Sequence, residues 1–155
     1  MDSITIRPGD QSHLEVCKNA LLCSEMGRVY FISDDRAIAY LTDGFTAGEI
    51  MVAVDEAGRA LGFIRIKPSG AFGSFPYVAC LAVSEAHRGK GIGSRLLASF
   101  EAEGFATASR VFLLVSDFNE AAQRLYRSRG YQQVGLLPGL FLDGIDELIM
   151  MKRRS

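Results

Sequence analysis

The chain has 155 residues, 48% of them hydrophobic and 23% charged, which suits one globular domain over residues 1–155. Its 17 Lys and Arg against 18 Asp and Glu leave a net charge of -1, without the basic excess that binds nucleic acid through phosphates. No apolar run approaches the roughly 18 residues of a membrane span, and the first residues lack the features of a signal peptide. We therefore expect a cytoplasmic protein that binds neither nucleic acid nor a membrane.

The cysteines and histidines predict neither a disulfide framework nor a metal site. Cys17, Cys23 and Cys80 cannot all pair within one chain, and they form no Cys-x-x-Cys motif. His13 and His87 are isolated in the sequence. We expect three reduced thiols that pack as small apolar groups, and no bound metal.

The first half of the chain predicts strands on either side of two helices. An alternating segment stops at Pro8-Gly9, and Asp10 is placed to cap a helix. The period changes from helical to alternating after Asp43-Gly44. The expected elements are a strand at 4–7, helices at 10–22 and from 34 or 35 to 41, a hairpin of strands at 50–54 and 61–66, and a strand at 75–83.

The second half alternates between helix and strand. The expected elements are a helix at 91–108, a strand at 111–115, a helix at 119–129 and strands at 131–136 and 147–151. Antiparallel strands followed by a β-α-β-α-β half predict an α/β (α+β) fold, in which helices cover a mixed sheet. The segment 68–73, rich in small residues, is expected to be a mobile loop.

The most informative segment is the loop Arg88–Ser94, which joins an apolar strand to the start of a helix. It holds three glycines in five positions and two cations, Arg88 and Lys90. Glycine lets an anion approach main-chain N–H groups, and the first turn of a helix leaves such groups unpaired. We therefore predict an anion-binding loop in preference to a plain turn.

Two nucleotide-binding motifs do not fit this loop. A Walker loop needs a glycine five residues before the Gly89-Lys90 pair, where the chain has Ser84. A dinucleotide fingerprint that starts at Gly89 needs glycine at position 94, where the chain has Ser94. The anion is therefore expected to belong to another kind of ligand.

Two segments match a pair of motifs that occur together in one protein family. Arg88-Gly89-Lys90-Gly91-Ile92-Gly93 fits a pyrophosphate loop of the form Arg/Gln-x-x-Gly-x-Gly/Ala. The segment from Asn119 to Tyr131 holds every fixed position of Asn-x-x-Ala-x-x-Leu-Tyr-x-x-x-Gly-Phe/Tyr. With the order of elements from about Ile4 to Lys152, the chain resembles the GCN5-related N-acetyltransferase (GNAT) family over nearly its whole length.

The resemblance implies a mostly antiparallel central sheet of about six or seven strands, flanked by about four helices. A splayed pair of parallel strands would hold acetyl-coenzyme A (acetyl-CoA) as the acyl donor. One N–H group of the strand end would polarise the thioester carbonyl. The implied cofactor-binding residues are Leu81, Ala82 and Val83 for the pantetheine arm, Arg88, Gly89, Lys90, Gly91, Ile92, Gly93 and Ser94 for the pyrophosphate, and Asn119 and Tyr126. Asn119 equally suits a helix N-cap.

By the same resemblance, Tyr126 is the catalytic residue. Its phenol, with a pKa near 10, would protonate the departing thiolate, although a tyrosine here also suits packing against the sheet. Some family members use a glutamate on the strand before the loop, but residues 60–84 contain no Asp or Glu. The general base is left open among Asp117, Glu49, Tyr77 and water.

The sequence therefore predicts an N-acetyltransferase, an acyltransferase of the EC 2.3.1 type, in which an unidentified primary amine attacks acetyl-CoA directly in a ternary complex. The alternative is a non-catalytic acyl-CoA-binding or sensing module of the same fold.

Cys80 is expected to pack in the core and not to carry an acyl group. A homodimer is one expected form, since dimers are common among the proteins it resembles. We expect the acceptor to be selected by the N-terminal helices and by the loops around residues 30–31, Phe45, 72–75 and 137–143.

Overall fold

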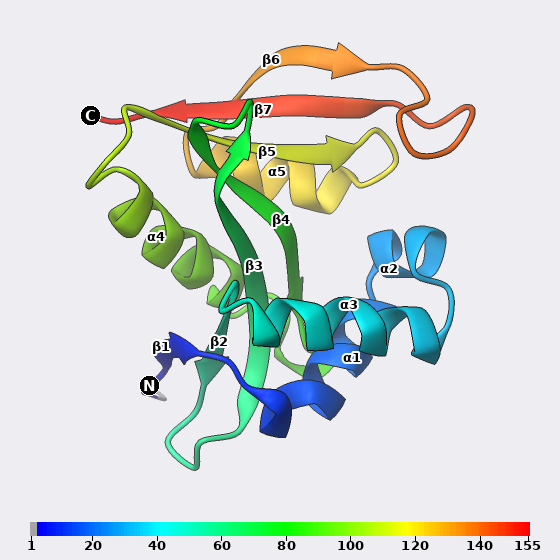
Figure 1. Cartoon of the computed structure of the whole chain (residues 1–155), viewed down its shortest axis with the longest axis vertical. Helices are drawn as coiled ribbons and strands as arrows, with labels where there is room; N and C mark the ends of the chain where they lie inside the picture. Colours follow the sequence, from blue (N-terminus) through cyan, green and yellow to red (C-terminus); the bar gives the residue numbers. More distant parts are fainter. Residues whose placement is uncertain (1–2) are drawn as a thin grey trace. The chain divides into compact units, whose positions relative to one another are not determined.

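The computed structural model describes residues 3–155, in which seven strands form one sheet and five α-helices accompany it (Figure 1). The strands are β1 (Thr5–Pro8), β2 (Ile50–Val54), β3 (Ala60–Ala71), β4 (Phe75–Val83), β5 (Arg110–Ser116), β6 (Gln132–Leu137) and β7 (Glu147–Arg153). The helices are α1 (Leu14–Leu22), α2 (Glu25–Tyr30), α3 (Asp34–Thr46), α4 (Ile92–Gly104) and α5 (Glu120–Ser128), with short 3-10 turns η1 (Gln11–His13) and η2 (Glu85–His87).

The sheet has the order β1-β2-β3-β4-β5-β7-β6, and the predicted mixed α/β fold is confirmed. β1 pairs with β2, β2 with β3, and β7 with both β5 and β6, all antiparallel. β4 and β5 are the parallel pair, with Tyr77 opposite Phe112 and Val78 opposite Leu113. The last strand of the chain thus inserts between two strands that precede it.

The chain divides into two compact units that interleave along the sequence. The first combines residues up to Ile66 with Cys80–Ser99, and the second combines Lys67–Ala79 with Phe100–Ser155. Strands β3 and β4 therefore contribute residues to both units.

In the first unit, α1 and α3 lie side by side and pack on the sheet (Figure 1). Their shared core includes Cys17, Leu21, Leu41, Val52 and Phe63, all fully buried. Burying each large apolar side chain contributes about 1.5–3 kcal/mol, which holds the helices against this half of the sheet.

In the second unit, a buried carboxylate links three elements. Glu101 of α4 accepts hydrogen bonds from Arg129, which follows α5, and from Lys152 of β7, each at 2.8 Å. The two cations therefore pair with this carboxylate inside the second unit and join α4 to β7 and to the end of α5.

Several element boundaries differ from the predicted ones: the helix predicted at 10–22 is the 3-10 turn η1 followed by α1, and the ends of α3, β3 and α4 are shifted by four or five residues. Helix α3 continues through Asp43-Gly44, because Gly44 allows a close approach to Ile50: a Cβ there would lie 2.6 Å from the Ile50 Cδ1. The segment predicted as a mobile loop instead extends β3 to Ala71 beside β4. Helix α4 ends at Gly104 and not near residue 108. A Cβ at Gly104 would lie 3.0 Å from the side chain of Val111.

The sequence pattern did not predict α2, which is too short to show a helical period. The features that define α2 involve only residues close together in the sequence. The Ser24 hydroxyl accepts a hydrogen bond from the Gly27 N–H at 2.9 Å, as an N-cap does. A Cβ at Gly27 would lie 1.7 Å from the carbonyl oxygen of Leu21, so only glycine fits where this turn meets α1.

Arg65 is a buried cation that ties β3 to the helices of the first unit. Its guanidinium donates to the carboxylates of Asp43 at 2.6 Å and Glu49 at 2.7 Å, and to the Tyr40 carbonyl at 2.9 Å. The group also lies 4.4 Å from the centre of the Tyr40 ring. One side chain thus connects α3 with the residue that precedes β2.

We expect Arg65→Ala to lower the free energy of unfolding by about 3 kcal/mol or more, because it removes the buried guanidinium that binds Asp43, Glu49 and the Tyr40 carbonyl. The matched control is Arg59→Ala, which removes an ion pair with Asp55 from the same hairpin. The Arg59 side chain is 78% exposed, so its loss should cost no more than about 1 kcal/mol. Urea denaturation of both variants measures the difference, and equal losses would contradict the role assigned to Arg65.

Candidate functional site

The end of β4 leads directly into the predicted anion-binding loop. Ala82 is buried, while Leu81 and Val83 are half-buried. The Ser84 N–H donates to the Leu61 carbonyl at 2.8 Å, which holds the strand end against β3. The chain then passes through η2, and α4 begins at the buried Ile92.

Two glycines of this loop have a backbone conformation that other residues rarely adopt. The φ angles are +76° at Gly89 and +81° at Gly91. A Cβ at either position would meet no atom within 4 Å, so the backbone angle, and not crowding, favours glycine. The Gly91 carbonyl accepts the Arg95 N–H at 3.1 Å and so starts α4. The N–H groups of this first turn are free of intrahelical bonds by the geometry of a helix.

The two predicted cations of the loop differ in their surroundings. The guanidinium of Arg88 donates to the carbonyls of Val83 at 3.3 Å and Cys23 at 3.0 Å. It therefore braces the loop against the strand end and the segment after α1. Lys90 is exposed, Gly93 and Ser94 are half-buried in the first turn of α4, and the loop keeps a positive charge at the helix start.

The second predicted group of residues lies in the second unit, where β5 turns into α5. Asn119 is the N-cap of α5, because its side-chain oxygen accepts the Ala122 N–H at 3.2 Å. The amide of Gln123 donates to the carbonyls of Ser116 and Asp117, each at 3.1 Å. These bonds hold the turn in place, and the predicted N-cap is confirmed.

Tyr126 is buried on α5, with 7% of its surface exposed. Its ring meets that of Tyr131 edge to face, with 6.1 Å between the centroids. Tyr131 directly precedes β6 and is itself buried. Burial, together with the nearby charge of Glu101, raises the pKa of the Tyr131 phenol.

Two carboxylates considered as general bases already have partners. The Glu49 carboxylate accepts two hydrogen bonds from Arg65, at 2.7 and 2.9 Å. Asp117 is exposed, and one of its oxygens accepts the Asp146 N–H at 3.1 Å, which ties down the loop before β7. Glu85 lies exposed in η2.

The sequence patterns did not predict a further buried carboxylate in the second unit. Glu147, the first residue of β7, is 3% exposed and accepts a hydrogen bond from the Ser116 hydroxyl at 2.7 Å. The signal in the sequence is an acidic residue at the start of an apolar strand, but the pairing of β5 with β7 that buries it is not visible there.

Cys80 lies in the core of the first unit, as predicted, and burial raises the pKa of its thiol to about 12. The thiolate, which is the nucleophilic form, is therefore strongly disfavoured at neutral pH. Within residues 3–155, no cluster of three or more His, Cys, Asp or Glu side chains is arranged to hold a metal ion. No helix in this part of the chain is long and apolar enough to cross a membrane.

Comparison with known proteins gives matches over most of the chain. The model of the acetyltransferase (GNAT) family matches residues 19–131. The N-alpha-acetyltransferase RimI of Mycobacterium tuberculosis is 35% identical over 121 residues, which cover 76% of this chain and 75% of that protein. Across the curated relatives, the matched part spans from 37% to 75% of their length.

Solved structures of low sequence identity share the fold. An acetyltransferase of the GNAT family from Bacillus cereus superposes with a TM-score of 0.80 at 16% identity, covering 99% of both chains. The yncA protein of Salmonella typhimurium, solved with its cofactor acetyl-CoA, has a TM-score of 0.72 at 21% identity and covers 99% of this chain and 95% of its own.

Proposed function

Because this chain belongs to the acetyltransferase (GNAT) family, we propose that it transfers an acetyl group from acetyl-CoA to a primary amine in one ternary complex. The observation that carries the proposal is the junction of β4 and α4. There, a loop with two glycines at positive φ precedes a helix whose first N–H groups are unpaired within the helix. A helix start of this kind suits the pyrophosphate of coenzyme A.

The residues of the first unit fit this cofactor. Open space in front of Gly89 and Gly91 lets an anion approach the main chain, and Lys90 adds a full positive charge. The main chain of Leu81–Val83 would bind the pantetheine arm, and one of its N–H groups would polarise the thioester carbonyl. When bound, acetyl-CoA supplies the thioester from which the acetyl group is transferred.

In the second unit, Tyr126 would protonate the leaving group, the thiolate of coenzyme A, and Asn119 would contact its pantetheine arm. Tyr126 would give its phenolic proton to the departing sulfur, since a phenol and a thiol have similar basicity and no charged donor is needed. Asn119 would contact the pantetheine arm through groups that its capping bond leaves available. Both assignments rest on the match of this segment to the family motif.

We further propose that the acceptor is the N-terminal α-amine of a peptide or protein, as the name of the M. tuberculosis relative suggests. An α-amine has a pKa near 7.8, so about one molecule in ten is already neutral at pH 7. A lysine amine, with a pKa near 10.4, is neutral in fewer than about one molecule in a thousand. The absence of Asp and Glu from residues 60–84 suits the acceptor that needs the weaker base.

The base is then a weak proton acceptor. Glu49 is poorly suited, because its Oε1 atom already accepts two hydrogen bonds from the buried guanidinium of Arg65. The remaining candidates for the general base are Asp117, Tyr77 and a chain of waters.

A product screen tests the proposed reaction. The protein is incubated with acetyl-CoA and a panel of peptides, polyamines, aminoglycosides and amino acids, and mass spectrometry identifies every acetylated product. We expect peptides with a free N-terminus to gain one acetyl group, while the same peptides blocked at the N-terminus do not. Binding of acetyl-CoA without any product would instead favour the non-catalytic binding or sensing module.

Cys80→Ala tests whether the transfer passes through an acyl-enzyme. Because the neutral, buried thiol is a poor nucleophile, we expect the variant to keep kcat within about threefold of the parent. The smaller buried side chain should lower the free energy of unfolding by roughly 1–2 kcal/mol. The variant should therefore stay folded in assays at low temperature. A kcat reduced by orders of magnitude, with an acetylated Cys80 detected in the parent by mass spectrometry, would overturn direct transfer.

A further inference from the structure

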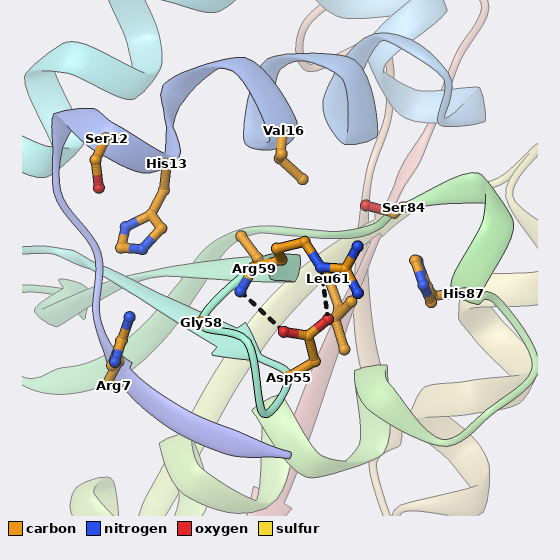
Figure 2. Close-up of a pocket in the computed structure, with 11 residues that line it drawn as sticks. Arg7, Ser12, His13, Val16, Asp55, Gly58, Arg59, Leu61, Ser84 and His87 are labelled. Atoms are coloured by element: carbon orange, nitrogen blue, oxygen red, sulfur yellow. Dashed lines mark hydrogen bonds and ion pairs between the residues drawn. The ribbon is translucent and has the colours of Figure 1, made fainter. Parts of the chain in front are cut away.

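A cavity of about 510 Å³ lies within the first unit, and neither Gly89 nor Gly91 is among the residues that line it (Figure 2). It is bounded by η1, by the turn between β2 and β3, and by the segment that follows β4. Its polar lining includes Arg7, His13, Asp55, Arg59, Ser84 and His87. Both histidines of the chain, isolated in the sequence, therefore line one cavity.

The charged side chains of this cavity leave a positive excess. Asp55 is held by the Arg59 side chain at 3.0 Å and by the N–H groups of Arg59 and Ala57, each at 2.9 Å, and these bonds lower the pKa of its carboxyl. Asp55 and Arg59 therefore offset each other. Within residues 3–155, the side chain of Arg7 makes no hydrogen bond or ion pair, and its charge is offset only through space by Asp10, whose carboxyl pKa it helps to lower.

The two imidazoles lie on opposite sides of the Asp55–Arg59 pair (Figure 2). The Nδ1 atom of His13 accepts the Asp10 N–H at 3.1 Å, so the proton of the neutral ring sits on Nε2. The Nδ1 atom of His87 is buried and has no hydrogen-bond partner among the described residues.

We propose that this cavity binds a small oxyanion, the phosphate or carboxylate group of a metabolite, at a site separate from the cofactor loop. The guanidinium of Arg7 and the imidazole N–H groups are donors that match the acceptor-only oxygens of such a group. The cavity volume falls within the range of small-molecule sites. Ser84 precedes η2 and His87 is its last residue, and the next residue is Arg88, so an occupied cavity would also restrain the start of the cofactor loop.

Because the chain has two histidines and both line the cavity, their imidazole NMR signals report directly on occupancy. The full-length protein is titrated with inorganic phosphate and, separately, with succinate, at constant pH and with ionic strength matched by sodium chloride. We expect saturable shifts of both the His13 and His87 signals, and the anion that binds more tightly identifies the ligand group. Shifts that do not saturate, or that sodium chloride alone reproduces, would overturn the proposal.

Arg7→Gln tests whether the cavity, and not the general charge of the protein, holds the anion. Arg7 is exposed on β1, so the variant should fold normally, and loss of a charge-assisted hydrogen bond should weaken phosphate binding about tenfold. Arg36→Gln on α3 removes the same charge from an exposed position outside the cavity and should leave the affinity unchanged. Equal weakening in both variants would contradict a built site.

A final titration distinguishes this cavity from the cofactor site. In protein saturated with coenzyme A, phosphate should still shift the His13 signal in a saturable way. Competition between the two ligands would make the cavity part of the cofactor site and overturn the assignment. The phosphate titration itself requires neither acetyl-CoA nor turnover, so it stands even where the proposed transferase activity fails.

Discussion

Replacing Gly91 by glutamate should abolish the binding of acetyl-CoA. A Cβ at this position points into open space at the start of α4, where we place the pyrophosphate. The new carboxylate would repel the phosphates and compete for the same N–H groups. We expect the dissociation constant, measured by isothermal titration calorimetry, to rise at least about 100-fold, which corresponds to about 2.7 kcal/mol.

Gly48→Glu is the matched control for this variant. Gly48, in the first unit after α3, also has a positive φ, of +69°, and a Cβ there would meet nothing within 4 Å. Both variants therefore carry the same backbone strain and the same added charge, and both should lose about 1–2 kcal/mol of stability. Acetyl-CoA should bind Gly48→Glu normally. Normal binding by Gly91→Glu, or an equal loss in both, would remove the basis for the phosphate site.

Tyr126→Phe should lower kcat about 100-fold or more and leave the affinity for acetyl-CoA nearly unchanged. The substitution removes the proposed proton donor, while the ring keeps its buried place against Tyr131. A loss confined to kcat indicates an interaction made in the transition state, so steady-state kinetics and a separate binding measurement are both needed.

Tyr131→Phe controls for the loss of a hydroxyl from the same pair of rings. Tyr131 is 2% exposed and precedes β6, where the family motif gives it no chemical role. We expect its kcat to stay within about threefold of the parent. An equal fall in both variants would point to packing of the ring pair, and an unchanged rate in Tyr126→Phe would show that another group protonates the thiolate.

Local signals in the sequence predicted the elements that carry the motifs. β4 (Phe75–Val83) agrees to the residue with prediction, because an apolar run between two turns defines both ends. Asn119 caps α5 as its side chain suggests, since a helix start depends on neighbours three residues away. Two of the three glycines of the Arg88–Ser94 loop, Gly89 and Gly91, adopt positive φ angles, which glycine tolerates best.

Features that depend on distant residues could not be predicted. The insertion of β7 between β5 and β6 is a property of the whole sheet, and it alone buries Glu147 beside Ser116. Within α3, Gly44 lies so close to Ile50 that a Cβ would not fit, and this contact with a residue outside the helix is not visible in the helical pattern. His13 and His87 share a cavity only because η1 and η2 come together in the first unit.

Acetyl transfer to an α-amine can be followed atom by atom in a single labelled peptide. A peptide with both a free N-terminus and an internal lysine is incubated with acetyl-CoA labelled with carbon-13 in the acetyl group, and fragmentation mass spectrometry locates the label. We predict that the label appears on the N-terminal nitrogen at a rate proportional to enzyme concentration and is absent from the lysine. Label on the lysine alone would contradict the proposed acceptor, and no label on any amine, in protein that binds acetyl-CoA, would contradict the transferase itself.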